Sequence, residues 1–118
     1  MQVKSLGSVK IIFLNKEAII KKLKEKAKKL KERDDVLEVY LFGSLVKGKA
    51  IPGSDADILI LLRRSDKKFL DRIPEFLEFF RGVGIGVEVF PYTLEEFELM
   101  KKENLFLREI TSYMIKLS

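Results

Sequence analysis

The segment "LFGSLVKGKAIPGSDADILILL", residues 41–62, places two aspartates, separated by a single residue, at the start of a strongly apolar run. Residues 57–62 are predicted to form a strand, and their nearly continuous apolar character indicates burial on both faces. Residues two apart on a strand point to the same side, so Asp55 and Asp57 would present both carboxylates together. Two adjacent negative charges repel, and a shared proton, a basic partner or a divalent cation would stabilise them.

The loop before these aspartates contains the residue types that bind a phosphate group. Gly43 and Gly48 permit close approach of the backbone, and Ser44 offers a hydroxyl. A helix that begins near Ser44 would also point free N–H groups at an anion. Lys47 and Lys49 add positive charge. The two carboxylates suit magnesium, which prefers oxygen ligands and completes its octahedron with water and substrate phosphate.

A third carboxylate lies in a separate segment. Residues 86–91 alternate Val87 and Val89 with Glu88, which predicts a strand with two valines on one face and the glutamate on the other. Three carboxylates beside a phosphate-binding loop would fit two-metal phosphoryl or nucleotidyl transfer. The alternatives are an exposed acid on an edge strand for Glu88, and an ordinary turn at residues 52–55 for the aspartates.

Hydrophobic periodicity predicts the elements of the first third of the chain. Apolar residues at spacings of three and four predict an amphipathic helix over residues 16–33. Residues 9–13 are compatible with a short strand before that helix, and residues 36–42 are rich in β-branched and apolar side chains, which predicts another strand.

A second helical pattern begins at Phe69 and stops at Gly82. Pro74 is expected either to interrupt this helix or to restart it as a first-turn residue. Thr93 and Glu96 match a capping box, which predicts the start of a further helix.

The further helix is expected to run to about Glu103, and residues 105–117 are predicted to form a last helix capped by Asn104. The order of elements is then helix, strand, strand, helix, strand, helix, helix. Such a mixture indicates an α/β (α+β) protein.

Composition limits the possible classes of protein. At 118 residues, 47% of them hydrophobic, residues 1–118 are expected to form one domain with a real core. The absence of cysteine and histidine excludes disulfides, a thiol nucleophile and the usual zinc sites, so a metal would need oxygen ligands. No apolar run approaches the roughly 20 residues that span a bilayer, and the first 20 residues lack a secretion signal, which predicts a cytoplasmic protein.

Two surfaces have competing interpretations. The net charge is +5, and the basic residues concentrate in the N-terminal third, but lysines surround the predicted helix everywhere outside its apolar stripe. That distribution favours a solvated face over a nucleic-acid-binding surface. Phe76, Phe79 and Phe80 most simply fill the core, although together with Phe106 and Tyr113 they leave room for a partner surface.

Gly43-Ser44, ten further residues and then Asp55-Ala56-Asp57 resemble the GS-x10-DxD signature of minimal nucleotidyltransferase (MNT) domains of the DNA polymerase beta superfamily. The likeness covers most of the chain, including the strand with Glu88. It implies a small mixed β-sheet flanked by helices.

The resemblance also implies roles for individual residues. Gly43 and Ser44 would contact the nucleotide's β- and γ-phosphates, and Asp55 and Asp57 would bind two Mg²⁺ ions. Glu88 would be the third ligand and the general base. The remaining expected nucleotide-binding residues are Lys47, Gly48 and Ser54.

Two positions depart from the family pattern. Many relatives carry arginine where Leu45 stands, so one triphosphate contact would be missing, and Lys47 lacks the bidentate fork that would replace it fully. The third acid is usually aspartate, and Glu88 is one methylene longer.

The resemblance implies transfer of AMP, or another nucleoside monophosphate, from ATP or another triphosphate to a hydroxyl. A chain of 118 residues leaves little room for an acceptor domain, so the acceptor site is expected to be shared with another polypeptide. Similar single-domain proteins are commonly antitoxins that bind HEPN-type ribonuclease toxins and attach AMP to a toxin tyrosine. The alternatives are a binding module that neutralises a partner without chemistry, and a transferase for small molecules that a homodimer could complete.

Overall fold

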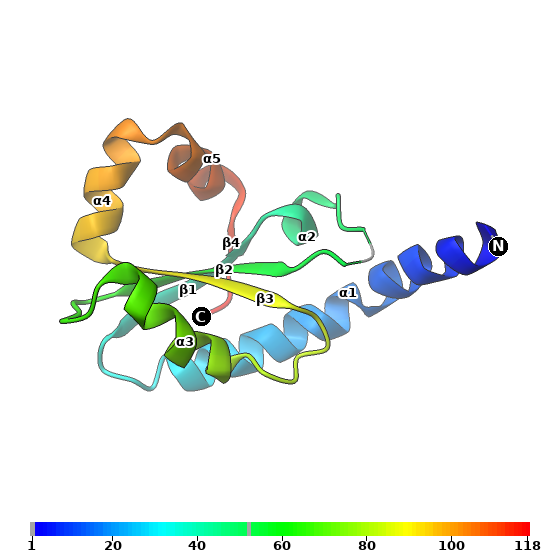
Figure 1. The fold of residues 1–118 in the computed structure, drawn as a ribbon, viewed down its shortest axis with the longest axis horizontal. Coiled ribbons are helices and arrows are strands. Elements are labelled where there is room, and N and C mark those ends of the chain that lie inside the picture. The colour runs from blue at the N-terminus through cyan, green and yellow to red at the C-terminus, as the bar shows by residue number, and fades with distance from the viewer. Residues whose placement is uncertain (1, 52) are drawn as a thin grey trace.

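The computed structural model describes residues 2–51 and 53–118, with side chains from Lys16 onward. Its sheet has the order β3-β2-β1-β4 (Figure 1). The central pair β1 and β2 is antiparallel, β3 runs parallel to β2, and β4 is antiparallel to β1. The expected mixed sheet is therefore confirmed. The strands are β1 (Val36–Phe42), β2 (Ala56–Leu62), β3 (Val87–Thr93) and β4 (Ile115–Lys116).

Helices cover both faces of the sheet, as expected for this fold class. In Figure 1, α1 and α3 lie below the sheet, and α4 and α5 lie above it. Within the described residues, no helix is both long and apolar enough to cross a membrane. The helices are α1 (Gln2–Leu30), α2 (Ser44–Lys47), α3 (Phe69–Phe79), α4 (Leu94–Glu103) and α5 (Leu105–Tyr113).

Two apolar clusters, one on each face, share strand β2. Ile58 and Ile60 pack with α1 and α3, whereas Leu59 and Leu61 pack with α4 and α5. All four side chains are buried, which confirms the prediction of a strand covered on both faces. Each fully buried residue of this kind stabilises the fold by roughly 1.5–3 kcal/mol. The strand that carries the aspartates is therefore rigidly held.

The first helix is longer than its periodicity predicted. Residues 9–13 belong to α1, so the short strand suggested there is wrong. Residues 8–30 contain neither glycine nor proline, and nothing in them interrupts a helix once it has begun. The predicted apolar stripe is confirmed where Leu23, Ala27 and Leu30 are fully buried against the sheet, and most of the surrounding lysines are exposed.

Pro74 lies inside α3, so neither expected alternative is correct. A proline at this position removes the hydrogen bond that its nitrogen would give to the carbonyl of Leu70. Leu70 is 74% exposed, so water can satisfy that carbonyl. Phe76 and Phe80 are buried in the core, and Leu77 is 37% exposed.

The caps of the last two helices are confirmed. The Thr93 hydroxyl accepts a hydrogen bond from the Glu96 N–H at 3.2 Å, and the Glu96 carboxylate accepts one from the Thr93 N–H at 2.9 Å. The Asn104 side chain accepts a hydrogen bond from the Leu107 N–H at 3.2 Å. These local bonds satisfy N–H groups that have no partner inside the helix.

The last predicted helix is too long. It ends at Tyr113, and Ile115–Lys116 form β4 instead. The N–H of Leu117 donates to the carbonyl of Val39 at 2.8 Å, and the Leu117 side chain is buried. Without β4, strand β1 would be an edge strand with unpaired backbone groups. Pairing with that edge stabilises residues 115–116 as a strand, although their sequence pattern favours a helix.

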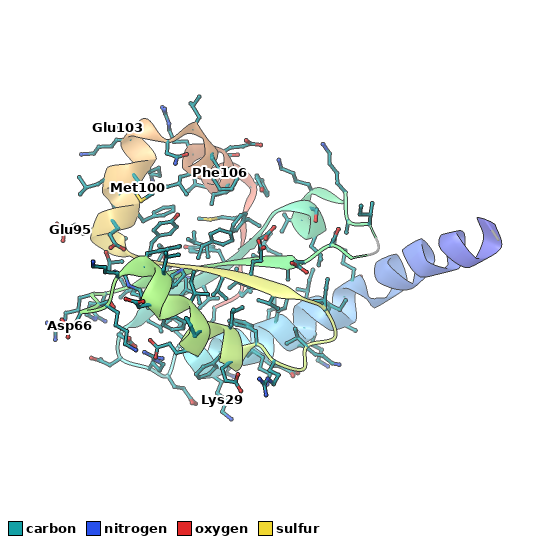
Figure 2. The ribbon with its side chains drawn as sticks, in the orientation of Figure 1. Lys29, Asp66, Glu95, Met100, Glu103 and Phe106 are labelled. Atoms are coloured by element: carbon teal, nitrogen blue, oxygen red, sulfur yellow. The ribbon has the colours of Figure 1, made fainter. Side chains whose placement is uncertain are left out.

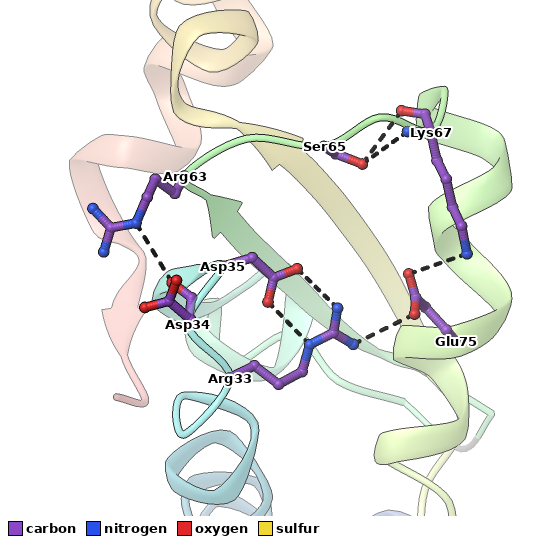
Figure 3. Close-up of polar contacts among 7 residues, drawn as sticks. All are labelled: Arg33, Asp34, Asp35, Arg63, Ser65, Lys67 and Glu75. Atoms are coloured by element: carbon purple, nitrogen blue, oxygen red, sulfur yellow. Dashed lines mark hydrogen bonds and ion pairs between the residues drawn. The ribbon is translucent and has the colours of Figure 1, made fainter.

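A polar cluster connects the end of α1 with α3. Arg33 forms a bidentate pair with Asp35, at 3.0 and 2.8 Å, and its third contact is Glu75 on α3 at 3.4 Å (Figure 3). Lys67 approaches the same glutamate at 3.7 Å. All these side chains are at least partly exposed, so each pair contributes little by itself.

Candidate functional site

The predicted phosphate loop and the predicted carboxylates meet at one end of the sheet. Asp57 pairs with Phe42 on β1 across the antiparallel ladder and with Glu88 on β3 across the parallel ladder. Gly43 directly follows Phe42, so three adjacent strands place the loop, the aspartate and the glutamate in a row. This proximity agrees with the sequence prediction.

The surroundings of Asp57 disfavour the ionised form of its carboxyl group. Burial, the negative charges of Glu88 and Asp55, and a hydrogen bond with Glu88 together raise the pKa of Asp57 to about 6, with burial the largest cause. Such a cluster of repelling oxygen atoms is what a divalent cation would stabilise.

Two glycines make room for the aspartate side chains. Gly43 has a φ of +84°, and a Cβ built on it would collide with the Asp57 carboxylate. A Cβ on Gly86 would collide with the Asp55 carboxylate. The carbonyl of Gly86 also accepts a hydrogen bond from the N–H of Ala56 at 2.8 Å. The prediction for Gly43 did not include this contact, and the need for glycine at position 86 was missed entirely.

Asp57 lies close enough to both Asp55 and Glu88 to feel their charges, but the three carboxylates do not form a metal site as they stand. In the part of the chain that the structure describes, no three histidine, cysteine or acidic side chains form a group that could hold a metal ion as they stand. The donor chemistry nevertheless fits magnesium, because Asp55 and Asp57 offer hard oxygen atoms and magnesium commonly uses only one or two carboxylates plus phosphate oxygens. Glu88 lies next to Asp57 across the parallel ladder, in the position from which it would supply a third oxygen ligand.

The remaining loop residues have unequal surroundings. Ser44 begins α2 and is half-buried, and Gly48 ends it with a φ of 72° in the left-handed region. The Ser54 hydroxyl accepts a hydrogen bond from the N–H of Ile51 at 2.9 Å, so it supports the turn before β2. Leu45 is 2% exposed and belongs to the core, which explains why position 45 of this chain presents no side chain to a ligand.

Helix α5 contacts the phosphate loop, which the sequence did not reveal. The N–H of Gly43 donates to the Tyr113 hydroxyl at 3.0 Å. Lys47 Nζ lies 2.8 Å from Glu109 Oε1 and 4.7 Å from the centre of the Tyr113 ring. The glutamate raises the pKa of Lys47, and the lysine lowers the pKa of Glu109. The Gly43 N–H and the Lys47 ammonium group, which a triphosphate would use, therefore already contact side chains of α5.

Aromatic side chains lie beside the carboxylates on the same face of the sheet. The ring centres of Phe42 and Phe90 are 5.2 Å apart, and those of Phe42 and Phe106 are 6.2 Å apart. Phe106 extends from α5 above the sheet and is 54% exposed (Figure 2). These rings provide an apolar wall beside the polar site.

Comparisons with known proteins agree with this geometry. Residues 8–117 match the family described as "Nucleotidyltransferase domain". A protein of Methanocaldococcus jannaschii, named "Putative protein adenylyltransferase", is 30% identical over 91 residues, which cover 74% of this chain and 62% of that protein. The chain thus spans less than two thirds of that relative's length.

A solved structure supports the same architecture. The crystal structure titled "a putative nucleotidyltransferase from Sulfolobus solfataricus" matches with a TM-score of 0.62 at 21% identity, covering 88% of this chain and 83% of that one. The likeness to that structure shows the fold. The family match over nearly the whole chain shows more: this protein belongs to the nucleotidyltransferase domain family.

Proposed function

We propose that this protein transfers a nucleoside monophosphate, most simply AMP, from a magnesium-bound nucleoside triphosphate to a hydroxyl group of another protein. The observation that carries the proposal is the row of Gly43, Asp57 and Glu88 across three adjacent strands. The family and the name of the Methanocaldococcus relative support the reaction class.

The phosphate loop would bind the leaving end of the donor. The backbone at Gly43 and the side chain of Ser44 would contact the β- and γ-phosphates, and Lys47 would add positive charge beside them. Asp55 and Asp57 would hold the metal ions. Magnesium, when bound there, would neutralise charge on the transferring and leaving phosphates.

Glu88 would act on the acceptor. Its carboxylate would take the proton of the acceptor hydroxyl as the hydroxyl oxygen attacks the α-phosphorus. The bond between that phosphorus and the oxygen bridging to the β-phosphorus breaks, and pyrophosphate leaves. The acceptor then carries the nucleoside monophosphate as a phosphodiester.

We assign the acceptor to a tyrosine of a HEPN-type toxin, with this protein as its antitoxin. The resemblance to MNT antitoxins motivates the assignment, and exposed apolar side chains on α4 and α5 support a protein partner. Leu99 is 59% exposed, Leu105 75% and Phe106 54%. Such side chains on neighbouring helices are typical of a surface that contacts another protein.

The reaction is tested by incubating the protein with Mg²⁺ and α-labelled nucleoside triphosphates, together with the product of the neighbouring gene. We expect label on the partner with the wild-type protein and none with Asp57→Asn. Asp66→Asn is the matched control, because Asp66 is exposed in a turn remote from the carboxylate row. Equal labelling by the wild type and Asp57→Asn would exclude the assigned role of Asp57.

The antitoxin role needs its own measurement. Mass spectrometry of the co-expressed pair should find an AMP-sized addition on a partner tyrosine. A partner that is fully neutralised but unmodified would show a binding module without chemistry. A protein that labels only a small molecule would show a transferase of another substrate class.

A further inference from the structure

The pairing of strands β1 and β4 sets Tyr113 beside the phosphate loop. Leu41 of β1 lies opposite Ile115 of β4 in an antiparallel ladder. In such a ladder each step forward on one strand is matched by a step back on the other, so two steps further Gly43 faces Tyr113. The hydrogen bond from the Gly43 N–H to the Tyr113 hydroxyl, at 3.0 Å, agrees with this register. Tyr113 is therefore positioned by the sheet as well as by α5.

The end of α5 is held on both sides of Tyr113. The Ile110 side chain is buried in the core, and its carbonyl accepts a hydrogen bond from the Met114 N–H at 2.9 Å. On the other side of Tyr113, the Leu117 N–H donates to the Val39 carbonyl at 2.8 Å. A nucleotide that binds to the loop therefore meets the Tyr113 ring in place, because moving the ring away would break these contacts.

Gly43 lies between the Tyr113 hydroxyl and the Asp57 carboxylate. The hydroxyl is bonded to the Gly43 N–H, and the carboxylate occupies the space that a Cβ of residue 43 would need. Resting on the proposed function, Asp57 and the loop bind the same triphosphate. Phosphates that extend from Asp57 to the loop must pass Gly43, where the hydroxyl lies.

The Tyr113 hydroxyl has a proton to donate. A phenol can accept one hydrogen bond and donate another at the same time, and Tyr113 uses its oxygen to accept the Gly43 N–H. Among the residues that the structure describes, none accepts a hydrogen bond from this hydroxyl in return. Accepting the N–H also polarises the O–H bond and makes it a stronger donor. The proton therefore suits an anion, with which hydrogen bonds are stronger than with a neutral acceptor.

We propose that Tyr113 is a further phosphate-binding residue of this protein. Its hydroxyl keeps the hydrogen bond from the Gly43 N–H and donates its own proton to an oxygen of the terminal phosphates of the donor. The Gly43 backbone then contacts the phosphates through this hydroxyl. The preference for a triphosphate over a monophosphate depends in part on Tyr113.

Calorimetric titration with Mg²⁺-ATP and with Mg²⁺-tripolyphosphate, which has no base or sugar, tests the proposal. Tyr113→Phe keeps the ring and should weaken both affinities about tenfold, as expected for the loss of one hydrogen bond to a charged group. The affinity for AMP should not change, because AMP lacks the β- and γ-phosphates. Tyr40→Phe is the matched control, since the Tyr40 hydroxyl donates to Glu38, earlier on β1, at 2.8 Å. Unchanged or tighter binding of ATP by Tyr113→Phe would overturn the proposal.

An NMR measurement separates direct contact from mere support of the loop. The chain has three tyrosines, so tyrosine labelled with ¹³C at Cζ gives one signal each for Tyr40, Tyr92 and Tyr113. Mg²⁺-tripolyphosphate should shift the Tyr113 signal of the wild-type protein more than either of the others. If Tyr113→Phe binds more weakly but the wild-type Tyr113 signal does not move, the hydroxyl only supports the loop and the proposal is wrong.

Neither measurement needs an acceptor, so this proposal and the proposed reaction can fail separately. If Tyr113→Phe loses affinity and the wild-type signal shifts, but no acceptor is ever labelled, the phosphate contact stands and the proposed reaction fails. If the wild type and Tyr113→Phe label a partner equally well at subsaturating ATP, the reaction stands and the phosphate contact fails.

Discussion

At the scale of single residues, Gly43 combines two demands that only glycine meets. Its φ of +84° is unfavourable for other residues, and the space of a Cβ is taken by the Asp57 carboxylate. We expect Gly43→Ala to displace that carboxylate, to abolish ATP binding measured by calorimetry, and to cost about 1–3 kcal/mol of stability.

Gly82 provides a matched control for this change. Its φ is +83°, but a Cβ there would meet nothing within 4 Å. Gly82→Ala should therefore carry the backbone strain alone and bind ATP as the wild type does. Equal ATP affinity of the two variants would show that the contact between Gly43 and Asp57 does not matter for binding.

Asp57 itself should limit the stability of the ligand-free protein. Burial and the nearby charges of Glu88 and Asp55 disfavour its ionised form. Asp57→Asn removes the charge and should raise the melting temperature at pH 7.5 by roughly 3–6 °C, equivalent to about 1 kcal/mol after allowance for partial solvent screening. Mg²⁺ with ATP should then stabilise the wild type but not the variant. A lower melting temperature for ligand-free Asp57→Asn would contradict this account of the repulsion.

At the scale of elements, α5 competes with a triphosphate for the loop. Glu109 engages Lys47, and Tyr113 accepts the hydrogen bond of the Gly43 N–H. Glu109→Gln should therefore increase ATP affinity by a few-fold at most, because exposed ion pairs are weak. Calorimetric titration of the variant measures this change. Glu103→Gln, on the exposed end of α4, is the control, and a weaker ATP affinity for Glu109→Gln would mean that Glu109 assists binding.

The elements also show where sequence patterns suffice. Strand β1 has the predicted bounds and β2 begins one residue earlier, because their apolar runs and the turn residues between them are local signals. Strand β4 could not be predicted, because its partner strand β1 lies some 75 residues earlier in the chain and no local pattern in Ile115–Lys116 indicates the pairing. The same applies to the site: the motif located the aspartates, whereas the contacts of Gly86 and Tyr113 exist only once the chain has folded.

At the scale of the whole molecule, the layers on the two faces of the sheet are connected at the β3 edge. Arg72 of α3 is only 3% exposed, and it pairs with Glu96 of α4 at 2.6 and 3.0 Å. Its guanidinium also donates to the carbonyls of Pro91 and Lys67, each at 2.9 Å. This arginine therefore fixes α3, which packs along β3, against the opposite layer.

The ion pair between these layers should make stability depend on pH in the acid range. The hydrogen bond from Arg72 is the main cause that lowers the pKa of Glu96 from 4.5 to about 2. A carboxyl whose pKa is lower in the folded state stabilises the fold above its unfolded pKa and loses that contribution as pH falls through its folded pKa. Removing the charge of Glu96 should therefore lower the free energy of unfolding at pH 7. The size of this effect should decrease between about pH 4.5 and pH 2.

Urea unfolding of the wild type and Glu96→Gln from pH 7 to pH 2.5 tests this dependence. At pH 7 the variant should be less stable by about 1–2 kcal/mol, below the 3–5 kcal/mol typical of breaking a fully buried pair, because Glu96 is 40% exposed. The difference should shrink as the pH falls, since protonation removes the same charge from the wild type. Glu95→Gln, an exposed neighbour without this partner, should behave as the wild type throughout. A stability difference that stays constant down to pH 2.5 would attribute the effect to the helix cap at Thr93 and not to the charge on Glu96.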